Sequence, residues 1–191
     1  MTEADARRRL VAGAADMIRR RGLNATSIRE VAKHAATPLG STYHYFPGGK
    51  QQLAAEAVRF AGETVGRMLA GQLAAGPVDG LRAFLALWRE VLVGSEFRAG
   101  CPVLAVSVEE APDEDRLAVL TAAAAVFDGW ETQLADSLRD HGVADGEAEE
   151  LATLVVAAAE GAVALCRAQR STVPLDRVAA RLESLLTAAA G

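Results

Sequence analysis

Apolar residues recur at intervals of three and four along almost the whole chain, and this periodicity constrains the fold more than any other feature of the sequence. Such spacing places side chains on one face of an α-helix. No segment shows the sustained alternation of apolar and polar residues that indicates a half-buried strand. We therefore predict an all-α fold of about nine helices, and the 191 residues are enough for a good hydrophobic core without disulfides or metals.

Glycine, proline and capping residues divide this pattern into separate helices. The first three are predicted over about residues 3–21, 27–35 and 38–44, and the last two over about 147–170 and 175–189. Four more fill the interval between them. Ser27 and Glu30 fit a capping box, in which each side chain satisfies a backbone donor of the first turn. Thr37 fits the N-cap of the third helix, and Pro38 fits its first position.

Two short helices joined by a tight turn, with small, hydroxyl and aromatic residues on the second, are typical of a helix-turn-helix. Small residues at the start of that helix would let its backbone approach the major groove of DNA. Tyr43 and His44 can donate hydrogen bonds to phosphate oxygens, and Lys50 offers a charge-assisted contact. Phe46 is predicted to be a core residue that holds the helix down. The candidate DNA-binding residues are Thr26, Ser27, Arg29, Thr37, Pro38, Leu39, Gly40, Ser41, Thr42, Tyr43, His44 and Lys50.

The charge of the chain is unevenly distributed. Residues 1–50 contain nine Lys/Arg and four Asp/Glu and carry +5, whereas the remainder contains eleven and twenty-one and carries −10. A basic region on an acidic body is expected if only that region meets a polyanion such as double-stranded DNA. Blocks of like charge are also common on solvated faces, so the charge distribution supports DNA binding only together with the helix-turn-helix motif. We predict a DNA-binding domain over residues 1–49 and a larger helical domain over residues 50–191.

Several residues at fixed spacing carry a family resemblance: Thr26–Ala32, Gly40–Phe46, Lys50 and Leu53. They resemble the DNA-binding domain of the TetR family of bacterial one-component transcriptional regulators, and the helix count and chain length are similar to that family throughout. Two positions depart from the family pattern, because Ala36 stands where a turn glycine is common and Thr42 where an aliphatic residue is common. The second departure leaves open whether Ser41 or Thr42 reads DNA.

Two further stretches, Tyr43–Lys50 and Gly100–Val103, resemble a subgroup that includes the lincomycin-resistance regulators. This resemblance implies a cytoplasmic, homodimeric, ligand-responsive repressor. A small apolar or aromatic effector would release such a repressor from a pseudo-palindromic DNA operator.

The family resemblance also implies a ligand cavity between helices of the larger domain. Its candidate lining residues are Phe60, Met68, Phe84, Trp88, Leu104, Val108, Phe127 and Trp130. For any single one of them, packing in the core is the more common role. Glu109, Gln133 and Arg89 are candidate polar anchors.

The dimer interface implied by the family is a four-helix bundle made by the last two helices of two copies. Its candidate residues are Leu151, Leu154, Val155, Ala158, Ala162, Val178, Leu182 and Leu185. Packing within one chain is the alternative for about half of these positions.

Other chemistry lacks a motif in this sequence. Cys101 and Cys166 show no zinc spacing, and no serine, histidine and aspartate form a nucleophilic motif. The Gly-Gly-Lys stretch has His44 and Gln51 where a phosphate-binding loop needs glycine and serine or threonine. We therefore expect no metal, no cofactor and no enzymatic activity.

Neither a signal peptide nor a membrane-spanning run is recognised, so no membrane partner is expected. Two alternatives to a ligand-responsive repressor stay open. The first is a regulator that senses redox state through its cysteines, although each cysteine is more often a small buried residue. The second is a helical enzyme that modifies a small molecule in the larger domain.

Overall fold

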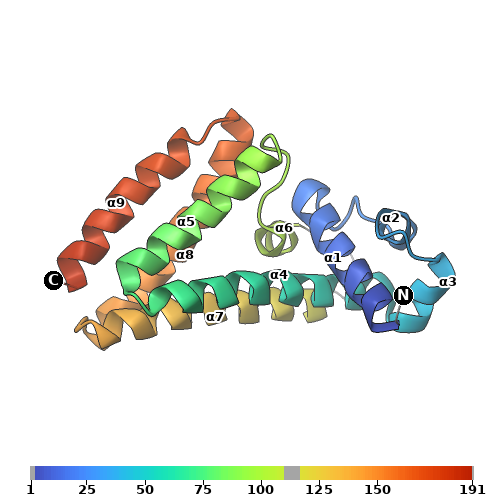
Figure 1. Ribbon diagram of the computed structural model, residues 1–191, viewed down its shortest axis with the longest axis horizontal. Helices are drawn as coiled ribbons and strands as arrows, with labels where there is room; N and C mark the ends of the chain where they lie inside the picture. The colour runs from blue at the N-terminus through green and yellow to red at the C-terminus, as the bar shows by residue number, and fades with distance from the viewer. Residues whose placement is uncertain (1–2, 110–116, 191) are drawn as a thin grey trace. The chain divides into compact units, whose positions relative to one another are not determined.

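The structure is a computed structural model that describes residues 3–109 and 117–190. Within these residues it contains nine α-helices and no strand, which confirms the all-α prediction. The helices shown in Figure 1 are α1 (Glu3–Arg21), α2 (Ile28–His34), α3 (Leu39–Tyr45), α4 (Gly49–Leu73), α5 (Pro77–Gly94), α6 (Pro102–Val108), α7 (Leu117–Asp140), α8 (Asp145–Gln169) and α9 (Val173–Ala190).

The chain divides into two compact units. The first comprises Met1–Glu63 and Cys101–Val126, and the second comprises Thr64–Gly100 and Phe127–Gly191. Because the boundaries fall inside α4 and α7, each of these two helices contributes to both units.

The first unit is built around α1, which packs against α2, α3 and α6. Its core contains Leu10, Ile18 and Phe46, and the full burial of Phe46 confirms its predicted core position. The guanidinium of Arg7 lies over the Phe46 ring at 5.3 Å from the centroid, a cation–π contact that covers the core from the solvent side. The core of this unit thus supports the short helices α2 and α3.

The second unit contains α5, α8 and α9, which pack against one another (Figure 1). Burial recurs at helical spacing on each of them, as an amphipathic helix in a bundle requires. At its edge Arg82 joins α5 to α9 by donating to both carboxylate oxygens of Glu183, at 3.2 Å each.

Among the described helices, α8 is long and apolar enough to cross a membrane by length and composition, with a hydropathy of 1.7 over its most apolar window. That window contains Glu160, so α8 does not carry the continuous run of about 18 apolar residues on which the sequence prediction was based. One face of α8, with Val155, Ala159 and Val163, is buried in the second unit. This is the arrangement of a core helix.

The helix ends confirm one sequence prediction and correct another. Ser27 Oγ accepts from the Glu30 backbone N–H, and the Glu30 side chain accepts from the Ser27 backbone N–H, so the capping box is confirmed. Thr37, however, is not the N-cap of α3: Pro38 occupies that position and provides no side-chain hydrogen bond. The helix begins one residue later than predicted, at Leu39.

Candidate nucleic-acid interface

The turn between α2 and α3 is a helix C-terminal turn made without glycine. Ala36 has a φ of 49°, in the left-handed region. The N–H of Thr37 donates to the Ala32 carbonyl at 2.9 Å, and the N–H of Ala36 donates to the Lys33 carbonyl at 3.1 Å. These two bonds form a Schellman motif. They hold an alanine in a conformation that glycine adopts more readily, which explains how the turn forms at this departure from the family pattern.

One face of α3 is open to solvent in the described structure. Gly40, Tyr43 and His44 are exposed, with 57% of Tyr43 accessible, and Ser41 is half-buried. A Cβ atom added to Gly40 would meet no described atom within 4 Å, so packing inside the chain does not account for glycine at this position. The face presents a hydroxyl, an imidazole and a phenol beside a short stretch of bare backbone.

Three threonines that were predicted to contact DNA are buried, which corrects that prediction. The hydroxyls of Thr26 and Thr37 donate to backbone carbonyls, at 2.7 Å and 3.2 Å. Thr42 is fully buried in α3, and its hydroxyl has no hydrogen-bond partner among the described residues. Thr42 therefore faces the core, so of the two neighbouring aliphatic hydroxyls in α3 it is Ser41 that lies near the surface.

The remaining candidates around α3 differ in how far they are engaged within the chain. Ser27 serves as the cap of α2, while Arg29 is exposed on the same helix. Lys50 is half-buried at the start of α4, and its Nζ donates to the Asn24 carbonyl at 3.4 Å. A phosphate group would have to compete with this weak bond for the Lys50 ammonium.

Acidic side chains neutralise part of the basic helix α1. The carboxylate of Asp16 accepts from Arg19 at 2.6 Å and from Arg20 at 3.1 Å. Burial raises the pKa of the Asp16 carboxyl, but the hydrogen bonds and charges of the two arginines outweigh burial and hold the pKa below its ordinary value of 3.8. At α3, Nε2 of His44 lies 3.6 Å from a carboxylate oxygen of Glu3.

Two family models match the chain over most of its length. The model described as bacterial regulatory proteins, tetR family, matches residues 10–57, which include the helix pair and the start of α4. The model described as transcriptional regulator LmrA/YxaF-like, C-terminal domain, matches residues 77–181. The chain belongs to the TetR family. It is a helix-turn-helix transcriptional regulator, and the resemblance to the family and its subgroup found in the sequence is confirmed.

One relative and two solved structures are similar to this chain over most of its length. The HTH-type transcriptional regulator Rv0196 of Mycobacterium tuberculosis is 44% identical over 95% of this chain and 94% of that protein. A TetR regulatory protein from Rhodobacter sphaeroides, 23% identical over 94% of this chain and 97% of that chain, shares the fold with a TM-score of 0.82. The TetR-family regulator CifR, solved as a cysteine mutant with 26-bp operator DNA, is 25% identical over 94% of each chain, with a TM-score of 0.70.

In the second unit of this TetR-family chain, four of the predicted ligand-binding residues form an aromatic cluster. Trp130 of α7 meets Phe84 and Trp88 of α5 edge to face, and it meets Phe127 of its own helix in the same way. Phe84 and Trp88 also meet each other, and the centroid distances of these contacts are 5.7 to 6.4 Å. Met68 is half-buried on α4 in the same unit. We call Phe84, Trp88, Phe127 and Trp130 the aromatic cluster.

Two buried polar atoms near the aromatic cluster lack hydrogen-bond partners among the described residues. They are Nε1 of Trp88, a donor, and Oε1 of Gln133, an acceptor. Gln133 follows Trp130 by one helical turn, and both side chains border Gly66 of α4. Buried indole N–H groups usually find a partner, so the bare Trp88 donor is unusual.

Other predicted ligand-binding residues lie in the first unit. Val108 is 73% exposed, which corrects the prediction that it lines an enclosed cavity. Phe60 borders an open surface groove of about 400 Å³ between α1 and α4, together with Arg7 and Arg59. Leu104 is half-buried on α6.

Two of the three predicted polar anchors are engaged elsewhere. Arg89 forms an ion pair with Asp176 of α9. Glu109 accepts a hydrogen bond from the backbone N–H of Asn24 at 2.8 Å. Sequence reasoning missed Asn24 altogether, because the two residues are 85 positions apart and no local pattern links them. Gln133 is the one predicted anchor that the structure brings to the aromatic cluster.

The predicted dimer residues on α8 and α9 divide into a buried and an outward-facing set. Val155, Ala162 and Leu182 are buried inside the chain, so the prediction that they form an interface is corrected: they belong to the core of the second unit. The outward-facing set comprises Leu151, Leu154, Ala158, Val178 and Leu185, which are exposed or half-buried.

Leu165 joins the outward-facing set, and sequence reasoning had not singled it out. It is 51% exposed on α8. A Cβ atom added to Gly161, one turn earlier, would meet no described atom within 4 Å. Leu154, Gly161, Leu165 and Leu185 thus present apolar or bare surface to the outside of the unit, and we call them the α8–α9 face.

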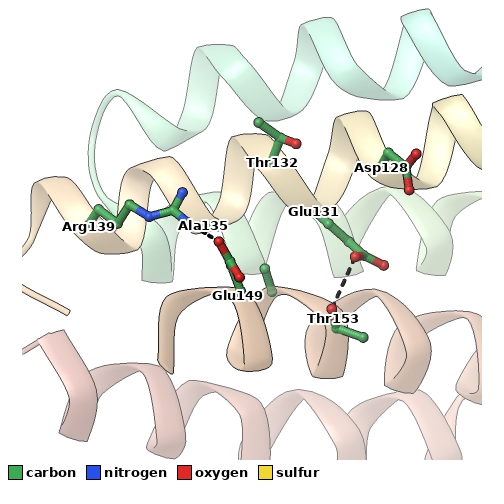
Figure 2. Close-up of a pocket in the computed structure, with 8 residues that line it drawn as sticks. Asp128, Glu131, Thr132, Ala135, Arg139, Glu149 and Thr153 are labelled. Atoms are coloured by element: carbon green, nitrogen blue, oxygen red, sulfur yellow. Dashed lines mark hydrogen bonds and ion pairs between the residues drawn. The ribbon is translucent and has the colours of Figure 1, made fainter. Parts of the chain in front are cut away.

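A surface groove of about 490 Å³ lies between α7 and α8 in the second unit (Figure 2). Arg139 pairs with Glu149 at 2.7 Å, and Glu131 accepts from the Thr153 hydroxyl at 3.0 Å. Asp128 adds a further negative charge to the wall. These polar groups mostly bind one another across the two helices, so the groove is explained by polar packing between α7 and α8 and not by a ligand.

Both cysteines are buried. Cys101 is the N-cap of α6 and accepts from the Leu104 N–H at 3.5 Å. Burial raises the pKa of the Cys166 thiol, which lowers the fraction of reactive thiolate. These surroundings favour a structural role over a redox role.

Proposed function

We propose that the chain is a homodimeric repressor that places α3 in the major groove of a pseudo-palindromic DNA operator and leaves it when a small aromatic effector binds. The exposed face of α3 is the observation that carries the proposal. In it, residues 1–49 contact DNA and residues 50–191 bind the effector and form the dimer. The site of action is the cytoplasm, where bacterial DNA lies.

Each α3 residue has a role that follows from its exposure and chemistry. Leu39 and Ser41 meet base edges, and Gly40 lets the backbone approach the groove. Tyr43 and His44 donate to phosphates, and the cations of Arg29 and Lys50 add contacts that do not depend on sequence. The complex of the related regulator CifR with operator DNA supports this use of the fold.

Dimerisation through the α8–α9 face would set the distance between two copies of α3. Exposed Leu154 and Leu165 lie two turns before and one turn after Gly161 on α8, where the surface is open, and this spacing favours close approach of a second helix pair. An isologous interface of this kind gives the two-fold symmetry that a pseudo-palindromic operator matches.

The effector would bind at the aromatic cluster. Four aromatic rings favour a flat ligand. The unpaired Trp88 Nε1 and Gln133 Oε1 indicate that this ligand carries one hydrogen-bond acceptor and one donor. The Trp88 indole donates to an acceptor of the ligand, and Gln133 Oε1 accepts from a donor. Release of DNA requires that the ligand bind more tightly to the conformation whose α3 helices no longer match the operator.

Tryptophan fluorescence tests the effector site directly, because both tryptophans of the chain belong to the aromatic cluster. Aromatic compounds that carry both a donor and an acceptor should quench it and dissociate the protein from its operator. Gln133→Leu should lower the affinity for the compound, measured by quenching, about tenfold, which is the loss typical of a polar group left without its partner. Gln72→Leu at an exposed position is the matched control and should change nothing. Equal affinity of all three proteins would contradict this site.

DNase I footprinting on DNA upstream of the chain's own gene and its neighbours tests the operator. We expect protection of two half-sites about 34–36 Å apart, or a multiple of that distance. Protection of a single half-site, or none, would argue against a dimer on a pseudo-palindrome.

A further inference from the structure

The turn between α1 and α2 is held from outside the helix-turn-helix by Glu109, which caps the C-terminal end of α6. The Asn24 backbone N–H donates to Oε2 of Glu109 at 2.8 Å. The other carboxylate oxygen lies against Gly22, and a Cβ atom there would overlap it. Gly22 also has a φ of 83°, which favours glycine. Backbone conformation and close approach thus both fit this turn to the carboxylate.

The same peptide segment is tied to the start of the helix-turn-helix. The Asn24 carbonyl accepts from Lys50 Nζ at 3.4 Å, and the Thr26 hydroxyl closes the turn on the Gly22 carbonyl at 2.7 Å. Ser27, the cap of α2, follows directly. The Glu109 carboxylate is therefore connected, within a few residues, to the N-terminus of α2.

We propose that Glu109 is a positioning residue for operator binding, which fixes the α1–α2 turn from the end of α6 without touching DNA. α6 packs against α1 in the same unit. Because the Glu109–Asn24 bond joins the C-terminal end of α6 to the turn after α1, a movement of that end relative to α1 would break it. The inference uses the proposed operator binding as one readout, and a second readout does not involve DNA.

The sign of the effect separates this role from simple electrostatics. Removing a negative charge from a DNA-binding unit strengthens binding to a polyanion if charge alone matters. Removing the Glu109–Asn24 hydrogen bond instead weakens binding to DNA, because the turn before α2 loses its position. Glu109→Gln deletes the charge and keeps an oxygen acceptor, whereas Glu109→Ala deletes both.

The experiment compares full-length wild type, Glu109→Gln and Glu109→Ala, with Glu63→Gln at an exposed position of the same unit as the charge control. Operator affinity is measured as a function of salt, and exchange of the Asn24 amide proton is followed by NMR without DNA. We expect binding about threefold weaker for Glu109→Gln and about tenfold weaker for Glu109→Ala, as for loss of a charge-assisted hydrogen bond. The salt dependence should not change, because no phosphate contact is lost. Glu63→Gln should bind the operator equally or more tightly than wild type.

The Asn24 amide should exchange about tenfold faster in Glu109→Ala than in wild type, and to an intermediate degree in Glu109→Gln. If the alanine variant fails to fold, the glutamine variant still decides both readouts. Unchanged exchange at Asn24, or operator binding by Glu109→Gln as tight as by Glu63→Gln, would overturn the proposal. If wild type binds no operator while exchange at Asn24 follows the prediction, the proposed function fails. The hydrogen bond by which Glu109 holds the α1–α2 turn is then still supported.

Discussion

Ala36 holds a left-handed backbone conformation at φ 49° without being glycine. Such a conformation costs an L-residue about 1–2 kcal/mol relative to glycine. Glycine loses more conformational entropy on folding than alanine, and this loss offsets part of that difference. We expect Ala36→Gly to raise the free energy of unfolding by roughly 0.5–1 kcal/mol. Urea unfolding checks this, with Ala86→Gly on the exposed side of α5 as a control that should lose about 1 kcal/mol. A loss of stability at both positions would contradict the role assigned to the turn.

Thr42 buries a hydroxyl without a hydrogen-bond partner in the described structure. Valine has nearly the same shape and removes the polar group, so Thr42→Val should stabilise the protein by about 1 kcal/mol. Operator affinity should stay the same, because the side chain faces the core. Thermal unfolding and a DNA titration of the same variant measure both effects. A change of operator preference would restore Thr42 as a residue that reads DNA.

The residues of α3 show where sequence reasoning reaches its limit. Short motifs and turn chemistry located the helix pair and identified Tyr43 and His44 on its outer face. They did not separate Ser41 from Thr42, because a helix of seven residues contains too few apolar positions to define its buried side. Packing against α1 and α2 decides that register, and it depends on residues distant in the sequence.

At the scale of the element, α3 should carry two separable kinds of DNA contact. Tyr43→Phe and Lys50→Ala remove phosphate contacts, so they should weaken binding to operator and random DNA by similar factors. Changes at Leu39 and Ser41 should instead alter which operator is preferred, by about 1–3 kcal/mol at one base pair. Titrations against operators with single base changes distinguish the two. Equal losses on specific and random DNA for all four variants would contradict these roles.

The helices themselves were predictable because their periods, caps and stops are local. The capping box at Ser27 and the start of α5 at Pro77 are examples. Contacts that join distant elements were not predictable, and the Glu109–Asn24 bond is the clearest case. The same holds for Val155 and Leu182, since helical spacing identifies an apolar side but not whether a chain's own core or a second copy covers it.

At the scale of the whole molecule, operator binding should depend on the α8–α9 face. Leu165→Glu places a charge where a second copy would bury it, so it should convert dimers to monomers and reduce operator affinity. Val93→Glu is the matched control, because Val93 is 54% exposed on α5 against 51% for Leu165. Sedimentation velocity measures the outcome. A Leu165→Glu protein that remains dimeric would place the interface elsewhere.

The most direct test of the regulator is a fluorescence-anisotropy titration of the purified protein against DNA from upstream of its gene and neighbouring genes. Random duplex serves as competitor at a fixed physiological salt concentration. We predict that one site binds at least about a thousandfold more tightly than random DNA. Binding without preference for any of these sites, at several salt concentrations, would contradict the sequence-specific role assigned to α3.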